Sequence, residues 1–232
     1  MGSEMCIRDS QRVALARAFL SSPQLLLMDE PLSALDQQAK NEILSYIEQC
    51  HKQMGIPIIY VSHALEEVSR LADYLLLMDN GRITHQGDIQ QVLTQLDSPL
   101  ALSTQAESIV DAVVVDVDQD YKLTYLDSAL GRVSVVSQDL DIGQAVRLRL
   151  AARDISLTHE PQKGTSILNI FAAEVEQIKP VSEALVTVRL LLNGVPVLAR
   201  LTKKSVDLLQ LEKGSEVYAQ VKSVAILNGC IS

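Results

Sequence analysis

The sequence predicts an α/β domain followed by an all-β domain, and two patterns carry this prediction. From Gln11 to about Asp97, short apolar segments alternate with longer segments of helical period, which is typical of a parallel sheet covered by helices. After Pro99, β-branched residues alternate with polar ones in short runs separated by Gly, Asn and Asp, which is typical of β-strands. The 232 residues, 47% of them hydrophobic, are enough for two such cores.

Composition excludes several classes of partner. The net charge of -9, the 3% aromatic content and the absence of Trp argue against nucleic-acid binding. The longest apolar runs, such as Leu75 to Met78, fall far short of the roughly 20 residues that a membrane span requires, so we expect membrane contact to go through a partner. Three cysteines without metal-ligand spacing fit a reducing cytoplasm.

The first half contains the parts of a strand-helix-strand unit. We expect strands at Leu25 to Met28 and at Ile58 to Val61. Between them, Asp36 to Met54 has helical periodicity, with Asp36 as the N-cap and Gly55 just past the end. Further on, Asn80-Gly81 predicts a tight hairpin.

The second half contains a weak internal repeat, although such a repeat also arises by chance in strand-rich sequence. One set of spaced residues recurs seventy-one positions later: Gly143, Val146, Leu148 and Leu150 become Gly214, Val217, Ala219 and Val221. Residues 99–160 carry five basic and ten acidic side chains, a net charge of -5, whereas residues 161–232 carry eight and six, a net charge of +2. The positive charge hints at an anion ligand, and random variation in surface charge explains it equally well.

The strongest chemical signal is the run from Leu25 to Asp36, followed by a second strand that ends at Ser62-His63. An apolar strand brings Asp29 and Glu30 to its carboxyl end, where open α/β sheets bind ligands, and such a carboxylate pair needs a counter-ion such as a magnesium nucleotide. Each feature alone also fits a helix cap or an ordinary loop. Their order and spacing together favour a functional site.

The segment from Gln11 to His63 resembles the nucleotide-binding domain of the ATP-binding-cassette (ABC) family. The resemblance implies that Asp29 is the Walker B carboxylate, which holds Mg²⁺ mainly through water, and that Glu30 orients and polarises the attacking water. It implies that Ser33 to Asp36 form the D-loop, which crosses a dimer interface. His63 then corresponds to the switch histidine that senses the γ-phosphate.

The same resemblance implies the cofactors and partners. ATP and Mg²⁺ are the expected cofactors. The expected partners are a second ATPase subunit in a homodimer, integral-membrane permease subunits and, indirectly, a periplasmic binding protein, with no nucleic acid. The expected location is peripheral, at the cytoplasmic face of the bacterial inner membrane.

Two motifs of the ABC family do not occur in this sequence. There is no Gly-rich phosphate loop ending in Lys and Ser or Thr, and the place of the Leu-Ser-Gly-Gly signature reads Met5-Cys6-Ile7-Arg8-Asp9-Ser10. We therefore expect residues 1–10 to be a non-native leader on an N-terminally truncated sequence. We also expect the chain alone to bind ATP weakly and to hydrolyse it negligibly.

The segment from Gln162 to Leu227 resembles the molybdate-binding β module called Mop or TOBE, found at the C-terminus of molybdate importer ATPases. Hydroxyl groups, backbone N–H groups and one or two cations suit a tetrahedral dianion. Leu168 stands where related binders often have Arg, which implies weaker binding. The residues that match the family's ligand positions are Ser166, Asn169, Lys222 and Ser223. This resemblance implies molybdate as a possible regulatory ligand.

These observations predict four parts: a leader at 1–10, the C-terminal part of an ABC ATPase domain at 11–98, the first half of an OB-like β domain at 99–160, and a Mop/TOBE module at 161–232. The predicted function is ATP hydrolysis that drives molybdate import. Three alternatives stay open. The first is that Lys222 and Ser223 are only solvated strand residues, which fits the sequence equally well. The second is that the chain is a cytosolic oxyanion sensor and not part of an importer. The third is that the imported substrate is sulfate, ferric iron, a sugar or a polyamine.

Overall fold

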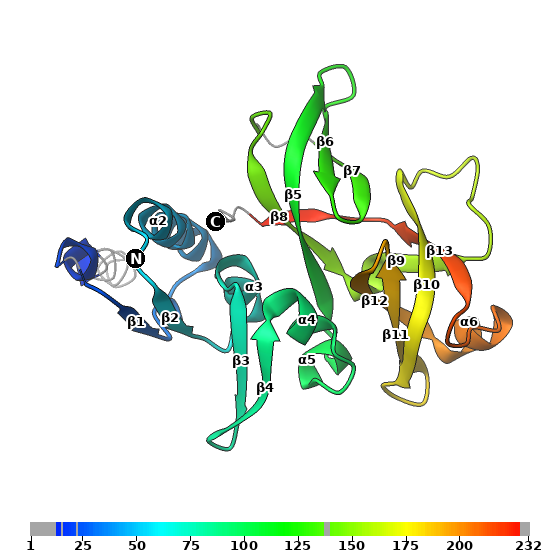
Figure 1. Ribbon diagram of the computed structural model, residues 1–232, viewed down its shortest axis with the longest axis horizontal. Coiled ribbons are helices and arrows are strands. Elements are labelled where there is room, and N and C mark those ends of the chain that lie inside the picture. Colours follow the sequence, from blue (N-terminus) through cyan, green and yellow to red (C-terminus); the bar gives the residue numbers. More distant parts are fainter. Residues whose placement is uncertain (1–12, 15, 22, 137–139, 228–232) are drawn as a thin grey trace. The chain divides into compact units, whose positions relative to one another are not determined.

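A computed structural model describes residues 13, 14, 16–21, 23–136 and 140–227 (Figure 1). The chain forms two compact units, one ending at Ala72 and the other running from Asp73 to Leu227. The predicted leader at residues 1–10 lies outside the described residues. The predicted division at residues 98 and 160 stays a prediction.

Unit 1 contains the expected strand-helix-strand arrangement. After helical residues 16–20, the elements are β1 (Leu26–Asp29), α2 (Gln37–Met54), β2 (Ile58–Val61) and α3 (Leu65–Leu71). β1 and β2 are parallel neighbours, with Leu26 opposite Ile58 and Asp29 opposite Val61. The carboxyl ends of both strands therefore lie at the same edge.

Helix α2 begins and ends where the sequence predicts. Its N-cap Asp36 accepts a hydrogen bond from the Ala39 N–H at 2.9 Å, and Gly55 ends it with a φ of 62°, a left-handed conformation that favours glycine. The buried side chains of α2 recur at helical spacing and join alternate residues of β1 in one core. That core includes Leu26, Met28, Ile43, Leu44 and Ile47.

Unit 2 begins with the predicted hairpin. β3 (Tyr74–Asp79) pairs with β4 (Arg82–Asp88), and Asn80 and Gly81 turn between them with φ values of 46° and 74°. Such left-handed pairs are what an Asn-Gly hairpin turn requires. Two short helices follow, α4 (Ile89–Thr94) and α5 (Pro99–Leu102).

The rest of unit 2 consists of two five-stranded antiparallel sheets that share one apolar core. One sheet has the order β14-β8-β5-β6-β7 and the other β12-β11-β10-β13-β9. The strands are β5 (Glu107–Asp118), β6 (Leu123–Ser128), β7 (Gly131–Val136), β8 (Ala145–Ala151), β9 (Ile155–Thr158), β10 (Asn169–Pro180), β11 (Leu185–Leu192), β12 (Val195–Thr202), β13 (Glu216–Val221) and β14 (Ala225–Leu227). A 3₁₀ turn, η1 (Ala152–Asp154), precedes β9, and α6 (Lys203–Leu208) follows β12.

The internal repeat predicted from sequence is confirmed by matching hydrogen bonds. The Gly143 N–H donates to the Val114 carbonyl at 2.8 Å, and the Gly214 N–H donates to the Val175 carbonyl at 2.7 Å. Both glycines have left-handed backbones, with φ of 86° and 88°. Each repeat therefore uses its glycine for the same turn before the same strand.

The two repeats exchange their last strands. β9 leaves the first repeat and pairs with β13 of the second, whereas β14 returns and pairs with β8 of the first. In Figure 1 the red C-terminal strand lies beside β8. The predicted succession of an α/β part and an all-β part is thus confirmed. Among the described residues, no helix is long and apolar enough to cross a membrane.

Candidate functional site

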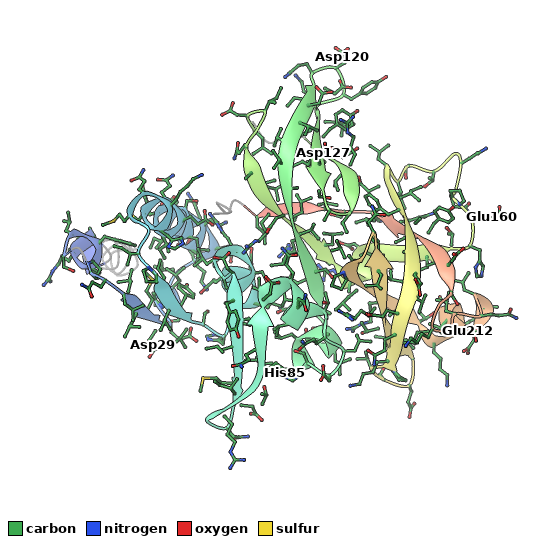
Figure 2. All side chains as sticks on the ribbon, viewed as in Figure 1. Asp29, His85, Asp120, Asp127, Glu160 and Glu212 are labelled. Carbon is green, nitrogen blue, oxygen red and sulfur yellow. The ribbon has the colours of Figure 1, made fainter. Side chains whose placement is uncertain are left out.

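The first candidate site, called here the strand-end site, consists of Asp29, Glu30 and His63 in unit 1. Asp29 is the last residue of β1 and its side chain is exposed (Figure 2). Glu30 follows with a φ of 46°, a strained conformation for a residue with a Cβ. Its N–H donates to the carbonyl of Val61 at 2.9 Å, so the end of β2 holds it.

The structure brings Glu30 and His63 together. The backbone N–H of His63 donates to Glu30 Oε1 at 3.0 Å, and His63 Nδ1 lies 2.6 Å from the same oxygen. The His63 side chain is 81% exposed and that of Glu30 34% exposed, so both are open to a ligand from solvent. A carboxylate in contact with an imidazole at a strand edge can accept a proton from a water molecule.

Behind this pair lies a buried carboxylate that the sequence analysis missed. Glu67 on α3 is only 4% exposed, and its oxygens accept hydrogen bonds from Lys40 Nζ at 2.7 Å, Tyr60 OH at 2.8 Å and Ser62 Oγ at 2.9 Å. Burial alone raises the pKa of Glu67, but these hydrogen bonds outweigh it and hold the pKa below its ordinary value. Burial also raises the pKa of Tyr60, so it stays a hydrogen-bond donor.

The predicted D-loop residues lie in the turn between β1 and α2. Ser33 is exposed, and its Oγ donates to the Glu30 carbonyl at 3.1 Å. Asp36 caps α2, as described above. Both contacts are local, and a role at an interface stays a prediction.

Hard oxygen ligands at the strand-end site suit Mg²⁺. Among the described residues, no group of three or more His, Cys, Asp or Glu side chains gathers for a metal ion. Mg²⁺ commonly takes only one or two carboxylates and completes its coordination with water and substrate phosphates. The exposed carboxylate of Asp29 fits that kind of site and not an all-protein metal cage.

The second candidate site is a pocket of about 240 Å³ in unit 2, called here the β pocket. It contains all four residues that the sequence analysis assigned to an oxyanion, although they come from two separate segments. Its lining is Leu123, Ser134, Val135, Val136, Ser166, Leu168, Asn169, Val221, Lys222, Ser223, Val224 and Ile226.

Asn169 is a buried residue in the lining of the β pocket, and it is bonded to the backbone of Ser134. It is 7% exposed, its Oδ1 accepts from the Ser134 N–H at 2.8 Å, and its Nδ2 donates to the Ser134 carbonyl at 2.9 Å. This two-bond contact joins the start of β10 to the edge strand β7. Asn169 thus acts mainly as a brace, and Ser134 is a lining residue that sequence reasoning missed because no motif marks it.

Lys222 and Ser223 lie between β13 and β14, where the chain crosses from one sheet to the other. The Lys222 N–H donates to the Asp154 carbonyl at 2.9 Å, which fixes the backbone while the side chain stays exposed. Lys222 is the only charged residue in the described lining. Leu168 and Val136 on the lining are 63% and 74% exposed.

The first repeat has its own counterpart of Asn169, which is Ser108, and the side chain of Ser108 is bonded within the chain. Ser108 stands six residues before Val114, as Asn169 stands six before Val175, and Ser108 Oγ accepts from the Leu198 N–H at 2.9 Å. There, Ala101 of α5 packs with Leu198 in a small apolar cluster. Arg200 Nη2 donates to the carbonyls of Ala101 at 3.2 Å and Ser103 at 2.9 Å, so one guanidinium nitrogen binds the C-terminal end of α5.

Comparison with known proteins gives matches in both halves. The TOBE domain family matches residues 165–227, a range that includes most of the lining of the β pocket. The molybdenum import ATP-binding protein ModC 1 of Azotobacter vinelandii is 44% identical over 220 residues, which are 94% of this chain and 61% of that protein. The ModC protein of Methylococcus capsulatus is 43% identical over 94% of this chain and 62% of its own length.

This chain therefore spans about three fifths of the length of the curated relatives that it matches. Among solved structures, the cytoplasmic molybdate-binding protein ModG with molybdate bound matches 53% of this chain and 96% of its own, with a TM-score of 0.48 and 20% identity. Over 94% of its length the chain is similar to the molybdenum import ATP-binding proteins, and the TOBE domain family matches residues 165–227.

Proposed function

We propose that this chain works in the ATP-hydrolysing subunit of an ABC importer for molybdate. The observation that carries the proposal is the contact of Glu30 with both the backbone and the ring of His63, next to Asp29 at the ends of two parallel strands. The names of the relatives, which match over both halves of the chain, support it.

In this proposal each residue of the strand-end site has one role. Asp29 would hold Mg²⁺, and Glu30 would orient the attacking water and take its proton. His63 keeps the Glu30 carboxylate in position and would sense the terminal phosphate of bound ATP. Bound MgATP supplies the phosphoryl group and the metal charge that stabilises its transfer. Ser33 and Asp36 belong to the loop that meets the second subunit of a homodimer.

The proposed partners are permease subunits in the membrane and, through them, a periplasmic binding protein. The proposed location is peripheral, at the cytoplasmic face of the inner membrane. The relatives' role in import supports these partners.

We further propose that the β pocket binds a tetrahedral oxyanion such as molybdate as a regulatory ligand. Lys222 supplies the positive charge, and the hydroxyls of Ser166 and Ser223 supply neutral donors. Asn169 holds the strand β7 in place beside the pocket through its two hydrogen bonds to Ser134. A volume of about 240 Å³ lies below the usual range for drug-sized ligands, which favours a small ion.

A second candidate function is a cytosolic oxyanion sensor. The observation that favours it is that every described lining residue of the β pocket belongs to unit 2. In that case oxyanion binding is independent of nucleotide. The imported substrate in either case is proposed as molybdate, with sulfate, ferric iron, sugars and polyamines as the other candidates.

Hydrolysis measurements on two proteins test the proposal. One is this chain, and the other is a chimera in which the N-terminal part of the Azotobacter vinelandii relative precedes Gln11. We expect the chimera to hydrolyse MgATP and this chain alone to be nearly inactive, because its sequence holds no phosphate loop. Molybdate titration of this chain without nucleotide then separates the two functions. An inactive chimera with tight oxyanion binding would favour the sensor.

A further inference from the structure

We propose that Glu67 is a positioning residue for the strand-end site: it fixes the loop that carries His63, so that His63 meets Glu30. The inference rests on the proposed function for its meaning, but its geometry belongs to this chain alone. Glu67 itself does not touch Glu30 or His63 in the described contacts, so it acts through Ser62.

The first step of the argument is that Glu67 joins three elements. Its Oε1 accepts from Lys40 of α2, and its Oε2 accepts from Tyr60 of β2 and from Ser62 in the loop after β2. A buried carboxylate is costly unless donors surround it. With three donors around it, Glu67 ties the loop to a helix and a strand at once.

The second step leads from Ser62 to His63. The Ser62 hydroxyl donates its single hydrogen to Glu67 and accepts from the Ala64 N–H at 3.1 Å. The backbone is therefore held on both sides of His63. Because the His63 side chain is 81% exposed, packing does little to hold it, and the loop backbone has to place it. That backbone also supplies the N–H that binds Glu30.

A second buried ion pair in the same unit provides the control. Glu48 of α2 pairs with Arg70 of α3, and both side chains are 8% exposed. The contacts that the structure describes for this pair stay within α2 and α3, including one from Arg70 Nη2 to Ser45 Oγ at 2.8 Å. If Glu67 had only a structural role, replacing Glu67 and replacing Glu48 would affect His63 equally.

Nuclear magnetic resonance on the purified 232-residue chain tests the proposal. The probes are the ¹⁵N shifts of the His63 ring, which report its tautomer, and the exchange rate of the His63 amide. We expect Glu67→Gln to move the ring signals and to speed amide exchange about tenfold, as the loss of one hydrogen bond does. Glu48→Gln should leave both signals in place, even where it lowers stability.

Ser62→Ala is the second variant, since it removes the link to the loop and leaves Glu67 with its two other donors. It should reproduce the His63 changes even if Glu67→Gln fails to fold. Unchanged His63 signals in Ser62→Ala, or equal changes in Glu48→Gln, would overturn the proposal. The measurement needs no nucleotide, so an inactive chimera would count against the proposed function and not against the positioning of His63.

Discussion

The strand-end site and the β pocket hold opposite charges, and they are braced by opposite kinds of residue. At the strand-end site, one carboxylate ends β1 and a second follows it, and the charged Glu67 holds the neighbouring loop. In the β pocket, the ammonium of Lys222 follows β13, and the neutral amide of Asn169 holds the edge strand. In both places charged groups lie at the end of a strand or just beyond it, and a buried side chain fixes the backbone nearby.

The two braces, Glu67 and Asn169, should respond differently to a change of pH. The Glu67 brace works only while its carboxylate stays deprotonated and paired with the cation of Lys40. The Asn169 brace is a neutral amide and depends on neither. The strand-end site should therefore respond to pH through its brace, and the β pocket should respond mainly through its ligand.

Among the variants of the β pocket and of the two braces, the largest effect is expected when the charge of the β pocket is removed. Lys222→Met should weaken molybdate binding about 10- to 100-fold, the range for loss of a charge-assisted hydrogen bond. Isothermal titration calorimetry measures it. Lys204→Met, which removes an exposed lysine of α6 outside the lining, should leave affinity unchanged. Equal affinity in Lys222→Met and the wild type would show that the pocket does not hold the anion.

The next effect concerns the amide brace. Asn169→Ala removes two hydrogen bonds to the Ser134 backbone, so it should lower the free energy of unfolding by about 1–3 kcal/mol. Urea denaturation of unit 2 measures it. Asn193→Gly is the control, because the Asn193 side chain donates one hydrogen bond, to the Leu130 carbonyl, and glycine tolerates its φ of 50°, so the loss should be smaller. A larger loss in Asn193→Gly would contradict the assignment of Asn169 as the brace.

A smaller gain is expected when a cation is added at the rim of the β pocket. Leu168→Arg should raise molybdate affinity about tenfold, because a second charge-assisted donor then reaches the anion. Leu208 is also exposed in unit 2 but lies outside the lining, so Leu208→Arg adds the same charge without the contact. If both variants gain equally, the effect is long-range attraction and not a pocket contact.

The smallest effect is a pH dependence of the charged brace. The folded pKa of Glu67 lies below its ordinary value of 4.5, so its contribution to stability is present above pH 4.5 and is lost as the pH falls below it. The stability difference between wild type and Glu67→Gln should therefore shrink on acidification. Hydrogen exchange of α3 amides at several pH values measures it. A difference that grows on acidification would mean that the folded pKa is raised.

Local patterns were enough to predict much of the fold. The caps of α2 and the Asn-Gly hairpin each depend on residues close together in sequence. The parallel pairing of β1 with β2 follows from the order strand, helix, strand along the chain. The four proposed oxyanion residues were found by resemblance to a family, and the structure gathers them in one pocket.

The strand pairings of unit 2 and the contacts of Glu67 could not be predicted. The exchange of β9 and β14 depends on pairing across the whole of unit 2, and alternation along a strand does not choose its partner. Glu67 follows Glu66 on a short helix, and nothing local marks which of the two is buried. Its three donors come from other elements, so only the assembled unit reveals its role.

The most direct test of the central claim is the hydrolysis rate of the chimera with Glu30→Gln, measured at saturating MgATP together with nucleotide binding. We predict a loss of about 10²- to 10⁴-fold in rate, the range for removal of a general base, while MgATP still binds. Glu42→Gln, which removes a carboxylate of α2 away from the strand ends, should keep the full rate. Undiminished hydrolysis in Glu30→Gln would contradict the assignment of Glu30 and, with it, the proposed strand-end site.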